Sequence, residues 1–398
     1  MFQQRARSLL GSIRIAAAWL PTLAGDGRSY HGDARAKSQE STLFAMPQQN
    51  FLAAVVKVCD EQFMKHGGDI SQAVADFGDG AGRTWLDLST GIAPEPYPLP
   101  EVPGAAWQQL PQKGAVDRLL GVARSAYGAT PDCPIVAAPG TQLLIQLLPL
   151  LRPGAEVRIL GPTYSEHAIC WKRTARQVTI VTALENLEAA DVAIITNPNN
   201  PDGRIAAPGT LQSLAEQMAK RDGLLIVDEA FADVMPAVSI VPRTGMPGLL
   251  VLRSFGKFFG LAGLRLGFAL GTTKDIAALE KLIGPWAVPG PALTIGTQAL
   301  GDVEWATAAR GRYREQAQQL DALLLNFGFE LVGGTSLYRL FKHDRAAAIH
   351  ASLARAGILT RIFDNDPTWM RFGLPGCTQN LERLAQSLQL AFSPTVAK

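Results

Sequence analysis

The sequence predicts an α/β protein in which a large domain, with a mostly parallel sheet between helices, precedes a smaller α+β C-terminal domain. Short apolar runs without polar alternation recur through the middle of the chain, as expected for strands buried on both faces. Helical patterns separate these runs, which favours parallel pairing. Residues 291–398 instead combine a long helical segment with short strand-like runs.

The elements can be placed in order along the chain. The expected strands of the large domain lie at residues 156–160, 192–196, 224–227, 249–252 and 266–270, and a helix is expected over 210–221. In the smaller domain we expect a helix over 305–326, strands at 329–332 and 337–341, and helices at 346–356 and 380–392. In such folds, ligands bind beyond the carboxyl ends of the strands.

Composition argues against several classes of protein. Lys+Arg 37 against Asp+Glu 35 gives a net charge of +2, without a long basic run, so no nucleic-acid partner is expected. No apolar run reaches the roughly 18 residues of a membrane span. The four cysteines (Cys59, Cys133, Cys170 and Cys377) show no zinc-site spacing, so we expect reduced thiols, a cytoplasmic protein and no metal site.

Polar motifs follow three of the expected strands. The strand at 192–196 runs into NPNNP (197–201), the one at 224–227 into Asp228-Glu229, and the one at 249–252 into RSFGK (253–257). Because the carboxyl ends of parallel strands share one sheet edge, we expect these groups to meet there.

Lys257 is the expected centre of the chemistry. It follows a buried strand and lies among three phenylalanines and several glycines, an unusual setting for a solvated lysine. A desolvated lysine has a depressed pKa and can attack a carbonyl as the free amine. Ser254 and Arg265 nearby can bind a dianion. An amine beside a phosphate site is what an aldehyde cofactor such as pyridoxal 5'-phosphate (PLP) requires.

The stretch SFGKFFGLAGLRLG (254–267) resembles the cofactor-lysine motif of class I/II aminotransferases, and the resemblance extends over roughly residues 64–393 in the family's order. It implies PLP fold type I, with Lys257 carrying PLP as a Schiff base. It also implies that Gly140-Thr141-Gln142, opening a helix, holds the cofactor phosphate together with Ser254 and Arg265. Taken alone, the PGTQ stretch would be an ordinary helix start.

The same resemblance assigns four further residues. Tyr164 corresponds to the aromatic residue that stacks on the pyridine ring, and Asn200 to the asparagine that bonds the ring's phenolic oxygen. Asp228 corresponds to the carboxylate that keeps the pyridine nitrogen protonated, so that the ring accepts electrons. Arg371 corresponds to the arginine that grips the substrate carboxylate, a task suited to a bidentate guanidinium. Lys257, Asp228 and Tyr164 are the expected catalytic residues.

Two positions depart from the family pattern. Many members have a tyrosine three residues after the aspartate, where this chain has Phe231, so one donor to the phenolic oxygen is lost. Many also have a Tyr-Pro-Asp stretch that reaches the partner subunit's cofactor phosphate. The nearest match here is Leu110-Pro111-Gln112, so a homodimer is expected without that hydrogen bond.

The motifs HGGD (66–69), LDLSTGIAP (86–94) and RFGLPG (371–376) resemble those of threonine-phosphate decarboxylases of cobalamin biosynthesis. The resemblance implies decarboxylation of L-threonine O-3-phosphate to (R)-1-aminopropan-2-yl phosphate and CO2. We expect Arg371, Arg361, His66, Thr90 and Asn200 to bind the substrate. His66 as a helix cap, Thr90 as a turn residue and Arg361 as a surface charge are the ordinary alternatives.

Other functions stay open. In a histidinol-phosphate-type aminotransferase, Lys257 would move a proton from the substrate Cα to the cofactor. A non-catalytic PLP-domain regulator would normally carry a DNA-binding module, but residues 1–63 show no basic recognition helix. A degenerate structural homologue is disfavoured by the intact Lys257, Asp228, Asn200 and Arg265.

The resemblance also divides the chain. Family members tend to begin just before His66, so residues 1–63 are expected to be either a poorly ordered extension, with a short helix over 51–63, or upstream codons assigned to the wrong start. Arg14 interrupts the apolar stretch near the start and no A-x-A cleavage site follows, so no export signal is expected. Residues 64–99 should join the small domain to the active site, 100–290 form the large PLP-binding domain, and 291–398 form the small domain.

Overall fold

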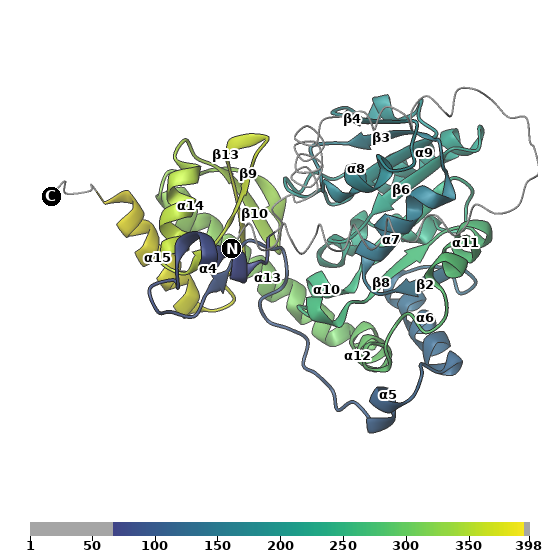
Figure 1. Cartoon of the computed structure of the whole chain (residues 1–398), viewed down its shortest axis with the longest axis horizontal. Coiled ribbons are helices and arrows are strands. Elements are labelled where there is room, and N and C mark those ends of the chain that lie inside the picture. Colours follow the sequence, from purple (N-terminus) through teal and green to yellow (C-terminus); the bar gives the residue numbers. More distant parts are fainter. Residues whose placement is uncertain (1–66, 394–398) are drawn as a thin grey trace, which may run out of the picture. The chain divides into compact units, whose positions relative to one another are not determined.

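The computed structural model describes residues 67–393, and these contain two main sheets with their covering helices (Figure 1). The expected extension over residues 1–63, its helix over 51–63 and His66 lie outside the described residues.

The larger sheet has seven strands in the order β2-β8-β7-β6-β5-β3-β4. All neighbours pair in parallel except β8, which runs antiparallel to both β2 and β7. The strands are β2 (Ile135–Ala138), β3 (Glu156–Leu160), β4 (Gln177–Val181), β5 (Val192–Thr196), β6 (Leu224–Asp228), β7 (Leu249–Ser254) and β8 (Gly267–Leu270).

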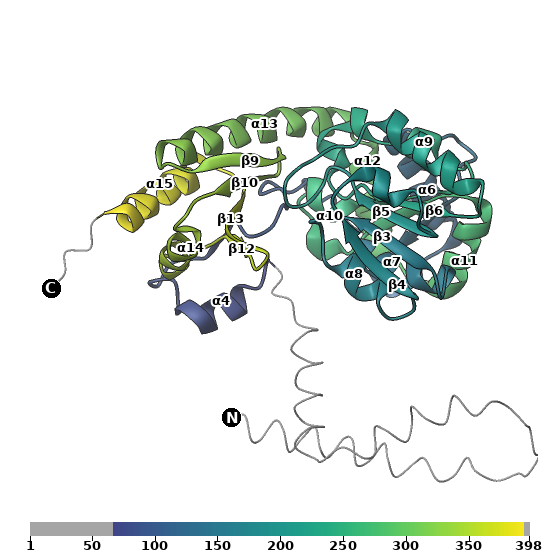
Figure 2. The same ribbon diagram turned by 90° about the horizontal axis from the view of Figure 1, so that it is seen from above.

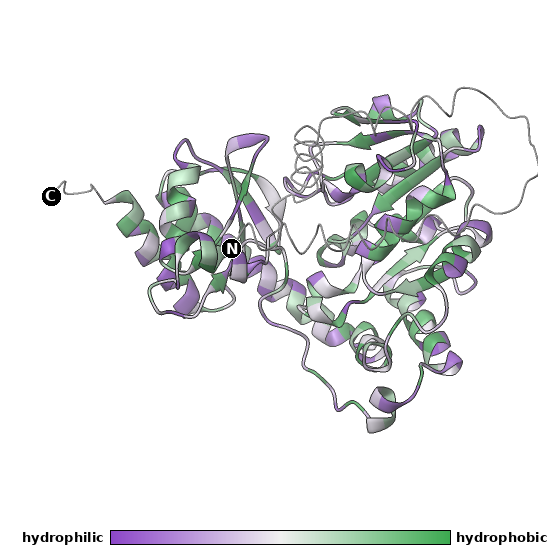
Figure 3. Ribbon diagram, in the orientation of Figure 1, coloured by the Kyte–Doolittle hydropathy of each residue, from purple (hydrophilic) through white to green (hydrophobic). Residues whose placement is uncertain are grey.

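Helices cover both faces of this sheet, which explains why its central strands are buried at every position and apolar up to their carboxyl ends (Figure 3). One face, carrying Ile195 and Val227, packs on α6 (Lys113–Tyr127), α9 (Pro208–Ala219) and α12 (Gly290–Gly301). The other, carrying Ile194 and Ile226, packs on α7 (Thr141–Leu147), α8 (Glu166–Trp171) and α11 (Thr273–Ile283). Successive residues of one strand therefore belong to two different cores.

The smaller sheet is antiparallel, with the order β12-β13-β10-β9. Its strands are β9 (Glu330–Thr335), β10 (Tyr338–Lys342), β12 (Arg361–Phe363) and β13 (Asp366–Gly373). Apolar residues of α14 (Ala346–Arg355) and α15 (Thr378–Phe392) pack in the same core as this sheet. A short parallel pair, β1 (Leu86–Asp87) with β11 (Ile358–Leu359), joins the N-terminal segment to this part of the chain.

The long helix α13 (Val303–Asn326) contacts both parts of the fold (Figure 2). Near its middle, the Tyr313 hydroxyl donates to the Phe258 carbonyl of α10 (Phe255–Phe258), which follows β7 of the larger sheet. Its second half contacts β9 and β10 of the smaller sheet. The remaining α-helices of the described residues are α4 (Ile70–Phe77) and α5 (Gly104–Gln108).

The predicted fold class is confirmed. The expected strands and helices correspond to β3, β5, β6, β7, β8, β9 and β10 and to α9, α13, α14 and α15, with ends that differ by a few residues. The strands β1, β2, β4, β11, β12 and β13 were not expected. Strand β4 lies at a sheet edge with Ile180 about half exposed, so it lacks the wholly apolar pattern of a central strand. None of the described helices is long and apolar enough to cross a bilayer.

Candidate functional site

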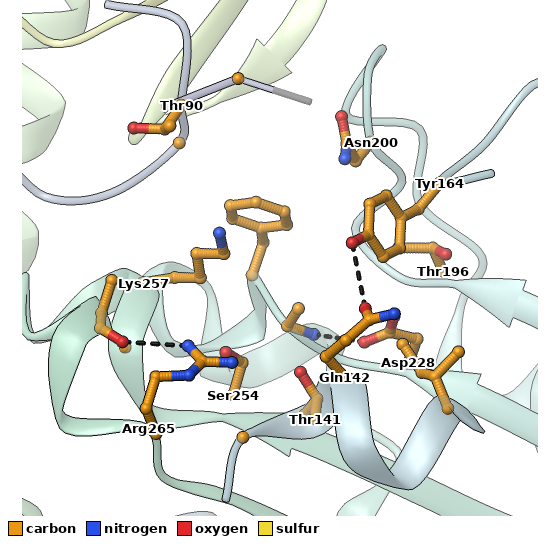
Figure 4. Close-up of a pocket in the computed structure, with 18 of the residues that line it drawn as sticks. Thr90, Thr141, Gln142, Tyr164, Thr196, Asn200, Asp228, Ser254, Lys257 and Arg265 are labelled. Carbon is orange, nitrogen blue, oxygen red and sulfur yellow. Dashed lines mark hydrogen bonds between the residues drawn. The ribbon is translucent and has the colours of Figure 1, made fainter. Parts of the chain in front are cut away.

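The carboxyl ends of the central parallel strands meet at one cavity, as the motif positions predict. Thr196 and Asp228 face each other in register at the ends of β5 and β6, and Ser254 closes β7. Around this cavity lie most of the residues singled out in the sequence, namely Thr90, Gly140, Thr141, Gln142, Tyr164, Asn200, Asp228, Ser254, Lys257, Arg265 and Arg371 (Figure 4). Residues more than 280 positions apart in the chain therefore share one site.

Lys257 lies in α10, directly after β7, and its amine points into the space below Thr90 and Asn200 (Figure 4). Burial lowers the pKa of Lys257 to about 8, and the nearby charges of Arg371 and Arg265 act in the same direction. A desolvated ammonium group with cations nearby gives up its proton more readily, although the carboxylates of Asp228 and Asp87 oppose this shift. Roughly a tenth of the amine is therefore unprotonated at pH 7, far more than for an ordinary lysine, and the free amine is a nucleophile.

An anion cradle is built beside this lysine. Gly140 has φ +81°, and a Cβ there would lie 2.6 Å from Nη2 of Arg265. A Cβ at Gly267 would lie 2.6 Å from the backbone nitrogen of Thr141, the first residue of α7. Both glycines therefore let the arginine and the helix start approach each other closely. Amide groups of a first helical turn and a guanidinium together suit a phosphate.

Asp228 is buried and its carboxylate is held on both oxygens. Oδ2 lies 2.9 Å from Nε2 of His167, and Oδ1 accepts from the backbone N–H of Ala230 at 3.1 Å. His167 is completely buried in α8, and its Nδ1 has no hydrogen-bond partner within residues 67–393. The sequence reasoning missed His167. It is the second residue of α8 and lies three residues after Tyr164, and this nearness in sequence to an expected site residue is the one signal that could have found it.

Tyr164 forms another wall of the cavity. Its hydroxyl donates to Oε1 of Gln142 at 3.1 Å (Figure 4), and Nε2 of Gln142 donates to Glu166 at 2.8 Å. Burial raises the pKa of Tyr164, and the charges of Glu166 and Asp228 raise it further. The phenol is therefore neutral, and its ring is held in a fixed orientation above the start of α7.

Arg371 reaches the cavity from β13 of the smaller sheet. Nη1 donates to Oδ1 of Asn200 and Nη2 to the carbonyl of Ser89 at 2.7 Å. Burial lowers the pKa of Arg371 to about 10, which leaves it charged at neutral pH. Its charge is balanced by no ion pair within residues 67–393. An unneutralised buried cation is a binding site for an anion.

Arg361 lies beside the cavity and does not line it. It faces Arg371 in register across the antiparallel pair of β12 and β13, so both side chains project from the same face of the sheet. Arg361 likewise takes part in none of the ion pairs found between residues 67 and 393. Two neighbouring arginines therefore stand at this side of the site.

The N-terminal segment supplies the wall opposite the larger sheet. Ser89 donates to Oδ1 of Asp87 at 2.5 Å and accepts from the backbone N–H of Gly68 at 2.8 Å. This arrangement fastens the turn at Gly67 against the cavity, beside Thr90. Asp87 and Ser89 were not expected to have a role. Phe231 also lines the cavity, so the position that lacks the family's tyrosine does face the site.

The comparisons with known proteins agree with this geometry. Residues 115–388 match the model of the family described as aminotransferase class I and II. Two relatives are named threonine-phosphate decarboxylase. One, from Sinorhizobium sp, is 45% identical over 81% of this chain and 97% of its own length. The other, from Pseudomonas aeruginosa, is 42% identical over 82% of this chain and 97% of its own length.

A solved structure shows the same fold. The histidinol-phosphate aminotransferase from Sinorhizobium meliloti, in complex with pyridoxal-5'-phosphate, superposes with a TM-score of 0.70 at 19% identity, over 83% of this chain and 95% of its own. The family model covers more than half of the chain, and the two decarboxylase relatives are covered almost completely. This chain therefore belongs to the aminotransferase class I and II family.

Proposed function

We propose that this protein is a PLP-dependent decarboxylase that converts L-threonine O-3-phosphate to (R)-1-aminopropan-2-yl phosphate and CO2 in cobalamin biosynthesis. The observation that carries the proposal is the 45% and 42% identity to two threonine-phosphate decarboxylases over 97% of their length. The site adds a chemical argument, because two arginines without ion-pair partners in the described chain suit a substrate with a carboxylate and a phosphate.

The residues around the cavity fit PLP. The Lys257 amine, with its lowered pKa, suits an aldehyde, and the close approach of Gly140, Thr141 and Arg265 forms a cradle for a phosphate. Ser254 lines the cavity beside this cradle. Asp228, held by His167, would face the pyridine nitrogen, while Asn200 and Tyr164 would hold the ring. When bound, PLP supplies an electron-accepting ring that stabilises negative charge at the substrate Cα.

The chain's own residues then direct the reaction. Arg371 would bind the substrate carboxylate, and Arg361, Thr90 and His66 its phosphate. Fixing both ends of the substrate determines which bond at Cα is broken, here the bond to the carboxylate carbon. Lys257 would return a proton to Cα, since a pKa of about 8 lets its amine hold and release a proton near neutral pH.

The test of this function is to incubate the PLP-loaded protein with L-threonine phosphate, without any keto acid, and to follow CO2. We expect CO2 release with the amine retained in the product, and no release by Lys257→Ala. Absence of CO2 from the wild-type protein, with conversion of histidinol phosphate once 2-oxoglutarate is added, would replace the decarboxylase by an aminotransferase.

The role of Arg361 has its own test. A charge-assisted hydrogen bond contributes about 1.5–3 kcal/mol, so Arg361→Ala should raise the KM for L-threonine phosphate at least tenfold, roughly. Arg355→Ala is the matched control, because Arg355 is an exposed arginine at the end of α14. An unchanged KM in Arg361→Ala would remove Arg361 from the substrate site.

We further propose a cytoplasmic homodimer. Large apolar side chains are exposed on and beside α5, including Trp107 and Leu110, which are 69% and 59% exposed. Apolar surface of this kind is typical of a subunit interface, and it adjoins Leu110-Pro111-Gln112. Light scattering of the purified protein should give twice the mass of the chain, and a monomer at working concentration would contradict this proposal.

A further inference from the structure

Tyr338, the first residue of β10, lies completely buried behind the cavity wall and contacts three parts of the site. We infer that Tyr338 is a positioning residue, which holds the turn at 199–203 and thereby places Asn200 and Arg371. It is not among the residues that line the cavity, so it acts through these neighbours. This inference rests on the proposed function, because it concerns the groups expected to hold cofactor and substrate.

The hydroxyl of Tyr338 donates to the backbone carbonyl of Asn199. The same carbonyl accepts the backbone N–H of Gly203 at 2.7 Å, which closes the turn that carries Asn200. The hydroxyl therefore fixes the peptide unit immediately before Asn200. Burial raises the pKa of Tyr338, so the phenol keeps its proton and remains a donor across the working pH range.

The ring of Tyr338 is held from two sides. Its centroid lies 4.8 Å from that of Phe231 in an edge-to-face arrangement, and the guanidinium of Arg371 lies 5.2 Å above it. A Cβ at Gly91 would lie 2.8 Å from both rings, so the segment at Gly91 closes over the pair. The ring thus supports Arg371 directly, and its hydroxyl does not replace the one missing at Phe231, because it is bonded to Asn199.

Backbone contacts lock the turn against the smaller sheet. A Cβ at Gly203 would overlap the carbonyl of Gly334, and a Cβ at Gly333 would overlap the carbonyl of Asp202. Both facing residues of β9 are therefore glycines at positions without room for a side chain. Since β9 pairs with β10, the contact of β9 with the turn at 199–203 also fixes the position of Tyr338 relative to that turn. The hydroxyl meets the Asn199 carbonyl because the two backbones are in contact.

The test is Tyr338→Phe, which removes only the hydroxyl and keeps the ring contacts. In the PLP-loaded protein, we expect the pH midpoint of the cofactor's absorbance change to rise by about half a unit, because a hydrogen bond contributes about 1 kcal/mol. Loss of the Tyr338 hydroxyl should displace the Asn200 amide, which is expected to bond the phenolic oxygen of PLP. That oxygen then carries more negative charge, so the proton that the bound cofactor holds beside it is released at a higher pH. We also expect the KM for L-threonine phosphate to rise about fivefold, as Arg371 loses its fixed partner.

Tyr97→Phe is the matched control. Tyr97 is also a buried tyrosine, but its hydroxyl donates to Asp302 at 3.1 Å and none of its described contacts involve the turn at 199–203. This variant should leave the absorbance midpoint and KM unchanged. A lower melting temperature of Tyr338→Phe, with both readouts at the wild-type value, would reduce Tyr338 to a packing residue and overturn the inference.

The outcomes separate this inference from the proposed function. A raised absorbance midpoint in Tyr338→Phe, in a protein that releases no CO2 from L-threonine phosphate, would support the positioning role and contradict the decarboxylase. CO2 release by the wild-type protein, with an unchanged absorbance midpoint and KM in Tyr338→Phe, would support the decarboxylase and contradict the positioning role. A purified chain that binds no PLP would overturn both.

Discussion

Replacement of Arg253 by methionine should strongly destabilise the protein, because two buried carboxylates, Glu229 and Asp233, lose the cation with which they pair. Arg253 is 3% exposed. Nη1 donates to Glu229 at 2.8 Å and Nη2 to Asp233 at 2.5 Å, and the guanidinium lies 4.3 Å above the ring of Tyr127. Glu229 follows Asp228 in the chain, so the network supports the end of β6 from which the site is built.

The magnitude follows from the contacts. Two hydrogen bonds to charged groups are lost, each contributing about 1.5–3 kcal/mol, which gives about 3–6 kcal/mol. The loss measured when one partner of a buried ion pair is removed is about 3–5 kcal/mol. We therefore expect Arg253→Met to lower the apparent free energy of unfolding by about 4 kcal/mol at neutral pH.

The assay is urea unfolding followed by circular dichroism at two pH values. Burial raises the pKa of Glu229, and Arg253 opposes this shift. The folded-state pKa of Glu229 is already above the unfolded value, and without Arg253 it rises further. The stability that protonated Glu229 contributes at low pH is lost as pH rises through the folded pKa, and the variant loses more of it than the wild type. The difference between Arg253→Met and the wild type should therefore be smaller in mildly acidic buffer than at neutral pH.

Arg339→Met is the control. Arg339 makes two hydrogen bonds to Asp321, both at 2.7 Å, but this pair is 17% and 19% exposed. Partial exposure lets water replace the lost partner, so the expected loss is about 1 kcal/mol. Equal losses in the two variants, or a loss below about 1 kcal/mol in Arg253→Met, would refute the reasoning from burial.

Three other predictions follow from the site. The rate at which the apoprotein captures PLP should rise with pH through a midpoint near 8, because Lys257 must lose its proton first; a midpoint near the ordinary value of 10.5 would contradict this. His167→Phe should weaken PLP binding about tenfold in equilibrium titrations, since Asp228 loses a buried charge-assisted partner; unchanged affinity would make His167 a packing residue. Gly203→Ala should lower stability by about 1–3 kcal/mol in urea unfolding, through overlap with β9 and its φ of +73°. Gly209→Ala, where a Cβ meets nothing, should not, and equal effects would contradict the proposed contact.

Much of the site could be predicted from sequence because its residues follow strands that can be recognised locally. The positions of Asp228, Ser254 and Lys257 after buried apolar runs place them at one sheet edge, and the structure brings them to one cavity. The anion cradle at Gly140 was predictable only through resemblance to a family, since PGTQ alone is an ordinary helix start. Its close approach to Arg265 is visible only in three dimensions.

The partners of the site residues could not be predicted in this way. His167 bonds Asp228 from helix α8, Asp87 and Ser89 bind the turn at Gly68, and Tyr338 reaches Asn199 from the smaller sheet. No local pattern distinguishes a tyrosine that begins an amphipathic strand from one whose hydroxyl supports a distant turn. A hydrogen bond between segments far apart depends on the docking of whole elements, which local periodicity does not encode.

The sequence alone determined the alternating arrangement of strands and helices and the order of the motifs, and it singled out Lys257 as the lysine expected to react. Strand burial imposes apolar runs, and parallel pairing brings strand ends together, so both leave a local signal. Only the tertiary structure decided that β8 runs antiparallel, that Arg361 stands opposite Arg371, and that Lys257 titrates at about 8. These properties depend on distances and desolvation between residues remote in the chain, which arise only when the two sheets pack around one cavity.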